Sequence, residues 1–257
     1  MLFFSAFDSR RGVFFMKKIK NYSLVIILII IWEIMCRFHL ISEFLLPSPY
    51  QVIKAFYLDF NLLMQHTYFT LTVAFIGVAI GILLSFVLSL LMDLYTPIYD
   101  MVYPVIILTQ TIPTIAIAPL LIIWLGYYMK PKIVLVVLST FFPITISLLN
   151  GYKSVDIDNI NLLKSMGANT YQMYRYLKIP TSFSYFFSGL KVSMSYSLIS
   201  AVVAEWLGGY YGLGVYMTRV KKAFALDKMF AVIFFITFLS LVLMSLIDVL
   251  EKKIVKN

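Results

Sequence analysis

The run TYFTLTVAFIGVAIGILLSFVLSLLM, residues 67–92, contains no charged side chain and decides the fold class. A helix that crosses the hydrocarbon layer of a bilayer needs about 20 mostly apolar residues, and this run is long enough. The run is continuous rather than alternating between apolar and polar residues. This pattern favours a membrane-spanning helix over a strand of a membrane barrel.

The rest of the 257-residue chain has the same character. Hydrophobic residues make up 61% of it and charged residues 13%, which is too apolar for a soluble globular domain. The charged residues cluster between long uncharged runs, which excludes a disordered, collagenous or coiled-coil protein. We therefore attribute the net charge of +9 to Lys and Arg at membrane surfaces rather than to nucleic-acid binding. The single cysteine, Cys36, cannot form an intrachain disulfide.

Further runs of similar length predict an all-α membrane protein with about six transmembrane helices. The expected spans are residues 21–38, 67–92, 102–127, 133–152, 182–207 and 229–250. A transmembrane domain over residues 21–250 then lies between an amino-terminal segment, residues 1–20, and a tail, residues 251–257. With both termini in the cytoplasm, more Lys and Arg fall inside than outside, as the positive-inside rule expects. The basic segment after the fifth span counts against this orientation.

The amino end mixes apolar and basic residues before Met16, whereas residues 16–20 resemble an ordinary start ahead of a first membrane helix. We therefore expect Met16 to be the true start. The first apolar run lacks a small-residue cleavage site, so it is expected to remain as an anchor helix.

The third predicted span is not a simple rod, because Pro104, Pro113 and Pro119 interrupt it. Such breaks are tolerated where other protein or a water-filled cavity satisfies the freed backbone groups. Gln110 and Thr114 flank the middle proline, and Gln110 would be costly to expose to lipid. These residues are candidates for a translocation path. A kinked packing helix is the alternative.

The fifth predicted span places Ser193, Ser197 and Ser200 on one helix face. This face is therefore turned toward something other than lipid. The serines are further candidates for the translocation path, and tight helix packing is the alternative that remains open.

The stretch between the fourth and fifth spans is the most informative one. Residues 155–180 read VDIDNINLLKSMGANTYQMYRYLKIP. The pattern predicts two short helices, since Asp158 can cap the first and Gly167 suits the left-handed residue that ends it. Asn169 and Gln172 resemble a capping box for the second helix, which is expected to stop before Pro180.

This stretch resembles the cytoplasmic signature of the membrane permeases of bacterial ABC importers. That signature runs Glu-Ala-Ala, three residues, Gly, nine residues, Ile, one residue, Leu-Pro. The positions that match its spacing are Gly167, Leu177, Ile179 and Pro180. Asn161 stands at the glutamate position and is followed by Leu162 and Leu163. This departure puts in doubt any polar contact that the family makes through its glutamate.

Two other motifs resemble the nitrate, sulfonate and taurine branch of these permeases, a branch that also includes carriers of thiamine-pyrimidine precursors. One is LPSP at residues 46–49, and the other is VAEWLGG at residues 203–209 followed by GLG at residues 212–214. The resemblance implies a type I ABC importer permease fold. It also implies a multi-pass inner-membrane homodimer that works with cytoplasmic ATPase subunits and an extracytoplasmic solute-binding protein.

By the same resemblance, residues 153–180 form a coupling segment that docks on the ATPase. The residues assigned to this contact are Asn161, Leu162, Leu163, Gly167, Ala168, Leu177, Ile179 and Pro180. ATP and magnesium would be held by the ATPase, because this chain lacks the Gly-x-x-x-x-Gly-Lys-Ser/Thr loop that cradles phosphates. We therefore expect a transport subunit without a cofactor or an enzymatic activity of its own. The expected solute is a sulfonate, taurine, nitrate or a thiamine-pyrimidine precursor.

The segment after the fifth span is expected to contact the solute-binding protein, because Arg219, Lys221 and Lys222 give it a basic surface. A solvated loop is the alternative.

A membrane enzyme is disfavoured, since His39 and His66 are expected in a solvated outer loop and no metal site is indicated. A secondary transporter or channel is the nearer rival. It would more usually place an ionisable residue deep in the membrane.

Overall fold

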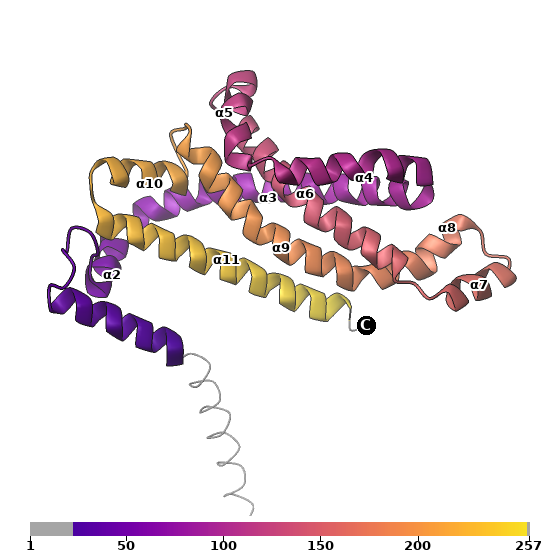
Figure 1. The fold of residues 1–257 in the computed structure, drawn as a ribbon, viewed down its shortest axis with the longest axis horizontal. Helices are drawn as coiled ribbons and strands as arrows, with labels where there is room; N and C mark the ends of the chain where they lie inside the picture. Colours follow the sequence, from indigo (N-terminus) through magenta and orange to yellow (C-terminus); the bar gives the residue numbers. More distant parts are fainter. Residues whose placement is uncertain (1–22, 256–257) are drawn as a thin grey trace, which may run out of the picture. The chain divides into compact units, whose positions relative to one another are not determined.

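The computed structural model describes residues 23–255, and every regular element in that range is a helix. A first helix covers residues 23–37. The elements that follow are α2 (Pro49–Leu58), α3 (Phe60–Leu94), α4 (Thr96–Thr111), α5 (Thr114–Leu125), α6 (Met129–Lys153), α7 (Ile157–Ser165), α8 (Thr170–Met173), the π-helical turn η1 (Tyr174–Lys178), α9 (Ile179–Trp206), α10 (Leu213–Lys222) and α11 (Leu226–Ile254). Figure 1 shows their order along the chain. The segment 1–20 and Met16 lie outside the described residues.

The chain forms two compact units. Within the described range, the smaller unit consists of residues 23–60 and Val220–Ala231, and the larger unit of Asn61–Arg219 and residues 232–255. In the smaller unit, Ser48 caps α2 through a capping box with Gln51. The apolar core of this unit contains Val52, Ala55 and Ala231, with Trp32, Phe56 and Phe230 packed against them. Lys228 pairs with Asp59 at 2.8 Å.

The core of the larger unit lies where α6 and α9 run side by side, as Figure 1 shows. Buried apolar residues from α3, α6, α9 and α11 meet there, among them Val73, Ile144, Leu198 and Leu243. Hydroxyl side chains also join these helices. Apolar packing alone would leave the hydroxyl groups without hydrogen-bond partners. Ser85 of α3 donates to the carbonyl of Phe141 at 2.8 Å.

The described helices agree with the predicted spans except at the first one. Four helices are long and apolar enough to cross a membrane: Phe60–Leu94, Met129–Lys153, Thr170–Trp206 and Leu226–Ile254. The pair formed by α4 and α5 makes a fifth span if it is counted as one. The helix over residues 23–37 is shorter than the roughly 20 residues of a full span. Residues 21–22 lie outside the described range, so the first span stays a prediction.

The third span is broken, as its prolines predicted. The axes of α4 and α5 differ by 99°. The break falls at Ile112 and Pro113, which are extended with ψ of 121° and 122°, because a proline pushes the preceding residue out of the helical region. Pro104 and Pro119 lie inside helices. Only the middle proline therefore ends one.

Candidate functional site: the coupling segment, the loop after α9 and the broken span

The first helix of the coupling segment, α7, is capped two residues earlier than predicted. Asp156, not Asp158, is the N-cap residue, and its carboxylate accepts from the backbone N–H of Asp158 at 3.0 Å. The prediction was wrong because both residues are good caps. Only Asp156 has the extended backbone that ends at the first helical residue, Ile157.

The turn after α7 confirms the prediction for Gly167. This residue has a φ of +77°. Its N–H bonds to the carbonyl of Lys164 at 2.9 Å, and the N–H of Ala168 bonds to that of Leu163 at 3.0 Å. These two bonds form a Schellman motif, which requires a left-handed residue at the glycine position. A β-carbon on Gly167 would meet no atom within 4 Å, so the backbone conformation alone favours glycine here.

The predicted capping box of the second helix is also confirmed. Gln172 N–H donates to the side chain of Asn169 at 2.9 Å, and Asn169 N–H donates to the side chain of Gln172 at 2.8 Å. The predicted stop before Pro180 is wrong. The helix passes through the π-helical turn η1 and continues as α9, so Thr170–Trp206 is one continuous helix. The wider turn changes the hydrogen-bond register just where Pro180 lacks a donor.

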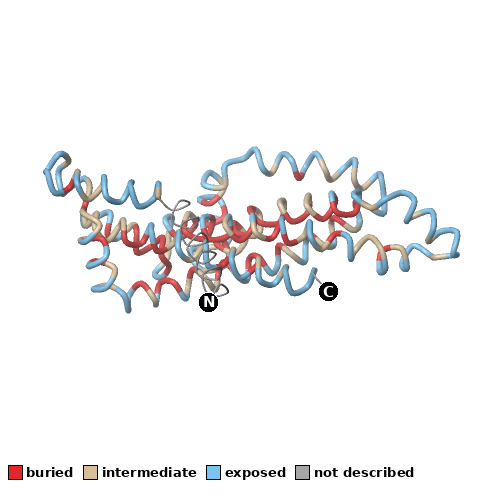
Figure 2. The backbone as a smooth tube through the Cα atoms, turned by 90° about the horizontal axis from the view of Figure 1, so that it is seen from below, coloured by how far each residue is buried: buried red, intermediate tan, exposed pale blue. Residues whose placement is uncertain are grey.

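The coupling segment exposes apolar side chains that no other part of residues 23–255 covers. No residue of α7 or α8 is buried. The exposed fractions are 62% for Ile157, 59% for Leu162, 73% for Met166 and 74% for Tyr171. Figure 2 shows this end of the larger unit in the colours of exposed and intermediate residues, while buried residues follow the central helices. A surface of this kind is typical of a contact with another protein.

The assigned coupling residues divide between this surface and the helix that follows. Asn161, Leu162 and Leu163 lie on α7, and Gly167 and Ala168 form the turn. The other three lie in η1 or in the first two positions of α9: Leu177, Ile179 and Pro180. Ile179 packs against the core of the larger unit. The residues assigned to coupling therefore lie partly on an exposed surface and partly on a helix that packs against the core.

At the other end of α9, the residues 207–214, here called the glycine loop, are held by a buried carboxylate. Glu205 is only 1% exposed. Its oxygens accept from the hydroxyl of Thr70 at 2.9 Å and from the N–H of Gly214 at 2.9 Å. The same hydroxyl accepts from the N–H of Leu213 at 2.8 Å, and His66 Nδ1 accepts from the N–H of Gly212 at 2.9 Å.

The burial of His66 corrects a prediction. His66 was expected in a solvated loop, but it lies in α3 and is 2% exposed. Glu205 is buried against backbone donors. Lys132 of α6 is also 2% exposed, and its ammonium lies 4.8 Å from the centre of the Phe69 ring.

The candidate translocation residues differ in how far they are buried. Gln110 is exposed and Thr114 is half-buried, on either side of the break between α4 and α5. Ser193, Ser197 and Ser200 are buried. Ser193 donates to the carbonyl of Thr140 in α6 at 2.7 Å, which is what the packing alternative describes. A path bordered by these residues stays a prediction.

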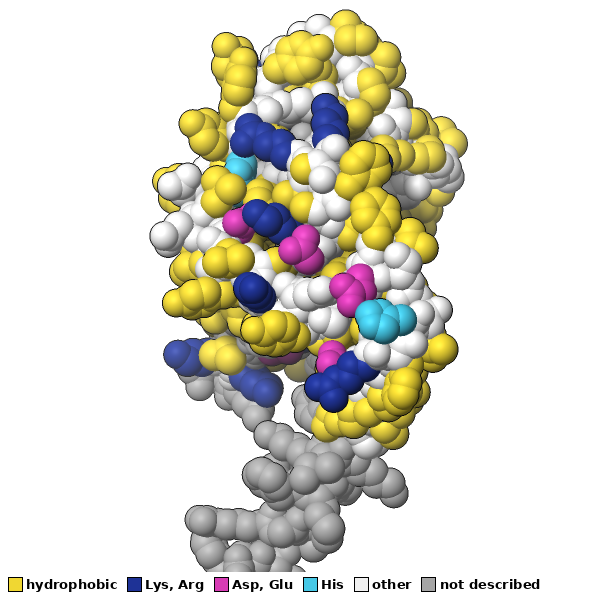
Figure 3. Space-filling view, turned by 90° about the vertical axis from the view of Figure 1, so that its left-hand side faces the viewer, with side chains coloured by type: hydrophobic (Ala, Val, Ile, Leu, Met, Phe, Trp, Pro, Cys, Tyr) yellow, Lys and Arg dark blue, Asp and Glu magenta, His cyan; other side chains and the backbone are white. Residues whose placement is uncertain are grey.

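The basic residues assigned to docking lie on α10. Arg219, Lys221 and Lys222 are all exposed. Arg219 donates to the carbonyl of Tyr210 in the glycine loop at 2.9 Å. Figure 3, which views the end of the molecule that carries α10, shows dark-blue Lys and Arg side chains among yellow apolar ones.

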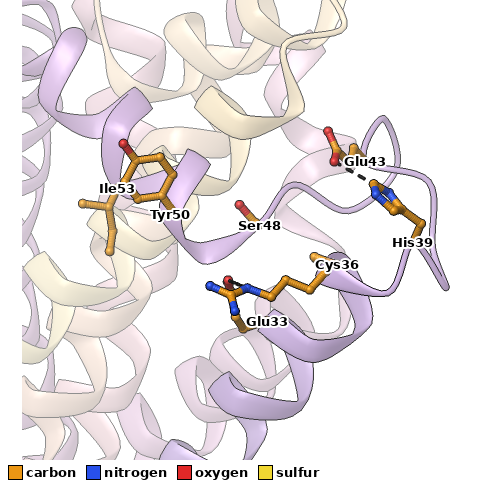
Figure 4. A pocket seen from close by; sticks show the side chains of 8 residues that line it. Glu33, Cys36, His39, Glu43, Ser48, Tyr50 and Ile53 are labelled. Atoms are coloured by element: carbon orange, nitrogen blue, oxygen red, sulfur yellow. Dashed lines mark ion pairs between the residues drawn. The ribbon is translucent and has the colours of Figure 1, made fainter.

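The smaller unit contains a pocket of about 640 Å³. Figure 4 shows its lining, with a dashed line between His39 and Glu43. Arg37 lies 3.3 Å from Glu33, and His39 lies 3.8 Å from Glu43. Arg37 and Glu33 are therefore an ion pair at this pocket. Among residues 23–255, no three His, Cys, Asp or Glu side chains gather as metal ligands would.

Comparison with known proteins identifies the family. The model of the family described as "Binding-protein-dependent transport system inner membrane component" matches residues 77–256, which is more than half of the chain. The chain belongs to this family. It is an ABC importer permease subunit and a multi-pass inner-membrane protein. The matched residues include the coupling segment, the broken span and the glycine loop.

Relatives with assigned names belong to the branch that the sequence motifs indicated. The formylaminopyrimidine transport permease protein ThiX of Halalkalibacterium halodurans is 37% identical over 227 residues, which cover 88% of this permease and 90% of ThiX. The riboflavin transport system permease protein RibX of Chloroflexus aurantiacus is 33% identical, with 90% and 87% covered. The putative aliphatic sulfonates transport permease protein SsuC of Bacillus subtilis is 24% identical, with 92% and 87% covered.

A solved structure confirms the predicted type I importer permease fold. A chain of the MetNI methionine ABC transporter, in an inward-facing conformation, matches the permease with a TM-score of 0.63 at 18% sequence identity. The match covers 76% of this permease and 95% of the MetNI chain.

Asp93 and Thr70 are the polar residues that sequence reasoning missed. Asp93 ends an otherwise uncharged run, which is a signal that a basic partner must lie nearby. Thr70 carries no comparable signal, because its partner Glu205 lies 135 residues away.

Proposed function

We propose that this permease imports a small nitrogen heteroaromatic nutrient of the thiamine-pyrimidine precursor class, driven by a separate cytoplasmic ATPase. The chain would form the solute path, and ATP and magnesium would be bound by the ATPase rather than by this chain. A solute-binding protein would deliver the solute from outside. Both termini would lie in the cytoplasm, and the transporter would contain two copies of the permease.

The observation that carries the coupling role is the geometry of the coupling segment. Leu162 of its first helix and Met166 just after that helix are exposed, and the turn at Gly167 fixes the angle to the next helix. That next helix is continuous with α9, so a force on α8 acts directly on a membrane helix. A surface of this kind suits a contact with an ATPase subunit that moves during its cycle.

The solute class rests on the order of similarity among relatives. Relatives named for formylaminopyrimidine and riboflavin transport are 37% and 33% identical to this chain. Those named for aliphatic sulfonate transport are 24% and 28% identical, and the one named for taurine transport is 26% identical. A flat ring with several nitrogens is therefore favoured over a sulfonate, taurine or nitrate.

Solute delivery would use the basic surface of α10. Arg219, Lys221 and Lys222 are exposed, and the bond from Arg219 to Tyr210 holds one of these side chains against the glycine loop. Inside the membrane, the path would pass Gln110 and Thr114 at the break of the third span. The serine face of α9 would reach the path only if α6 and α9 separate during the cycle.

The test is uptake by proteoliposomes that contain the permease, its ATPase and its solute-binding protein. We expect ATP-dependent uptake of labelled formylaminopyrimidine that excess unlabelled taurine does not compete away. Uptake of taurine alone would reassign the solute and leave the importer intact. Flux through the isolated permease without ATP or an ATPase would instead support a secondary transporter or channel.

The path has its own test in a Cys36→Ala background. Single cysteines at Gln110 and Thr114 should react with a small water-soluble thiol reagent during the cycle, because a path must be wet at some stage. A cysteine at Ser193 should react only with ATP present. Protection of all three positions in every nucleotide state would exclude this path.

A further inference from the structure

A buried ion pair joins the coupling segment to the end of another membrane helix. Asp93 is the next-to-last residue of α3, and its Oδ2 atom lies 2.6 Å from Nζ of Lys178. The same oxygen accepts from the hydroxyl of Tyr174 at 2.5 Å. The side chains of Asp93 and Lys178 are only 9% and 16% exposed. The pair is thus largely shielded from water.

Both partners of Asp93 lie on the π-helical turn η1. Tyr174 is its first residue and Lys178 its last, so one carboxylate spans the whole turn. Tyr174 is itself buried, with its ring centre 6.0 Å from that of Tyr152, and the Lys178 ammonium lies 5.0 Å from the Tyr174 ring. π-Helical turns are rare and occur frequently at functional sites. This one is fixed from both ends.

The position of η1 in the chain determines which displacements the ion pair of Asp93 and Lys178 can transmit. It lies between α8, in the coupling segment, and α9, within one unbroken helix of 37 residues. A displacement of α8 therefore reaches α9 through the backbone. It can reach α3 through the side-chain contacts of η1 with Asp93, which include an ion pair. Separating the two charges would leave each buried without its partner, which is costly, so the pair acts as a stiff connection.

We propose that Asp93 is a positioning residue that makes α3 move together with α9 when the coupling segment is displaced. The proposal rests on the proposed function, in which that displacement comes from the ATPase. Without the connection, ATP hydrolysis would still move α9. The membrane helices would no longer rearrange together, and less solute would cross for each ATP hydrolysed.

The decisive variant is the double substitution Asp93→Asn with Lys178→Met, in the complete transporter in proteoliposomes. Removing both charges leaves no buried charge without a partner, so the fold is expected to persist where Asp93→Asn alone could fail. We expect wild-type insertion and copurification with the ATPase. The solute taken up per ATP hydrolysed should fall about five- to tenfold, within the range of coupling between distant sites.

Two matched variants sharpen this result. Lys178→Arg keeps the positive charge within reach of Asp93 and should retain most of the wild-type ratio. Asp100→Asn removes an exposed carboxylate from α4 and should leave the ratio unchanged. A wild-type ratio in the double variant would overturn the proposal and leave Asp93 with a structural role only. A wild-type permease that copurifies with no ATPase would instead refute the proposed function, so the two failures are distinguishable.

Discussion

A turn that depends on glycine lies at each end of the continuous helix Thr170–Trp206, and the two turns depend on glycine for different reasons. At the coupling segment, Gly167 has a φ of +77° and open space around it. In the glycine loop, Gly212 has a φ of +127°, and a β-carbon there would collide with the carboxylate of Glu205. The first turn is specified by its backbone, and the second by its backbone and by the groups packed against it.

The difference indicates what each end does. A turn that touches nothing keeps its shape while its surroundings change, which suits a segment that contacts a moving partner. The glycine loop is bonded through Thr70 and His66 to α3, which lies far from it in the sequence, and through Glu205 to the end of α9, which directly precedes it. A loop held in this way keeps a fixed position relative to α3 and α9, which suits a surface that must be recognised.

The largest expected effect is that of Gly212→Ala. The added methyl group overlaps Glu205, and the positive φ is strained for alanine. Overpacking and strain together should lower the free energy of unfolding by about 3 kcal/mol or more. Thermal unfolding followed by fluorescence-detected size exclusion measures this. Gly126→Ala is the matched control, because Gly126 has a φ of +82° but no neighbour within 4 Å. Equal losses in the two variants would contradict a role for the contact with Glu205.

Thr70→Val is expected to have the next largest effect. Valine has nearly the same shape but leaves the N–H of Leu213 without its acceptor and Glu205 without its hydroxyl donor. Each buried group that loses its partner costs about 1–3 kcal/mol, so the melting temperature of the purified permease should fall. The control is Thr72→Val in the same helix, since Thr72 bonds only to the carbonyl of Tyr68. An equally large fall in melting temperature for Thr72→Val would show that the hydrogen bonds around Glu205 make no special contribution to stability.

Gly167→Val should affect stability less and function more. Valine in the left-handed conformation costs roughly 1–2 kcal/mol and no packed neighbour is disturbed. The membrane helices should therefore insert normally while α7 and α8 lose their mutual angle. ATPase copurification or solute-stimulated ATP hydrolysis should weaken severalfold. Retention of both wild-type uptake and wild-type stimulated hydrolysis in proteoliposomes would show that this segment is not the coupling element.

The features that could be predicted from the sequence are those whose partners lie nearby along the chain. Gly167 and the capping box of Asn169 and Gln172 were found correctly, because their partners lie within a few residues along the chain. The continuous uncharged runs correctly predicted membrane helices, and the middle proline, Pro113, correctly predicted the break in the third span. Each of these features depends on local steric and hydrogen-bonding requirements, which a short stretch of sequence carries.

The features that were missed depend on partners far away in the sequence. His66 was placed near water because an isolated charged or polar residue is usually exposed. Glu205 and Lys132 are buried as well. In the fold, buried backbone donors and side chains from distant helices surround them. The helix was expected to end before Pro180 for a similar reason, since nothing in the sequence marks the π-helical turn that Asp93 and the core hold in place.

Charge reversal at Lys221 and Lys222 should have the smallest effect on stability, because both side chains are exposed. If this surface meets acidic residues of the solute-binding protein, the double variant should bind it more weakly. The difference from wild type should be larger at low salt, because the Debye length is about 30 Å at 0.01 M ionic strength but about 8 Å at 0.15 M. Binding of the labelled solute-binding protein to the permease in nanodiscs at the two salt concentrations measures this. Reversal at Lys54, an exposed lysine of α2, is the control for nonspecific charge effects. If docking is unchanged at both salt concentrations, α10 is a solvated surface and the glycine loop must be recognised by its shape rather than by its charge.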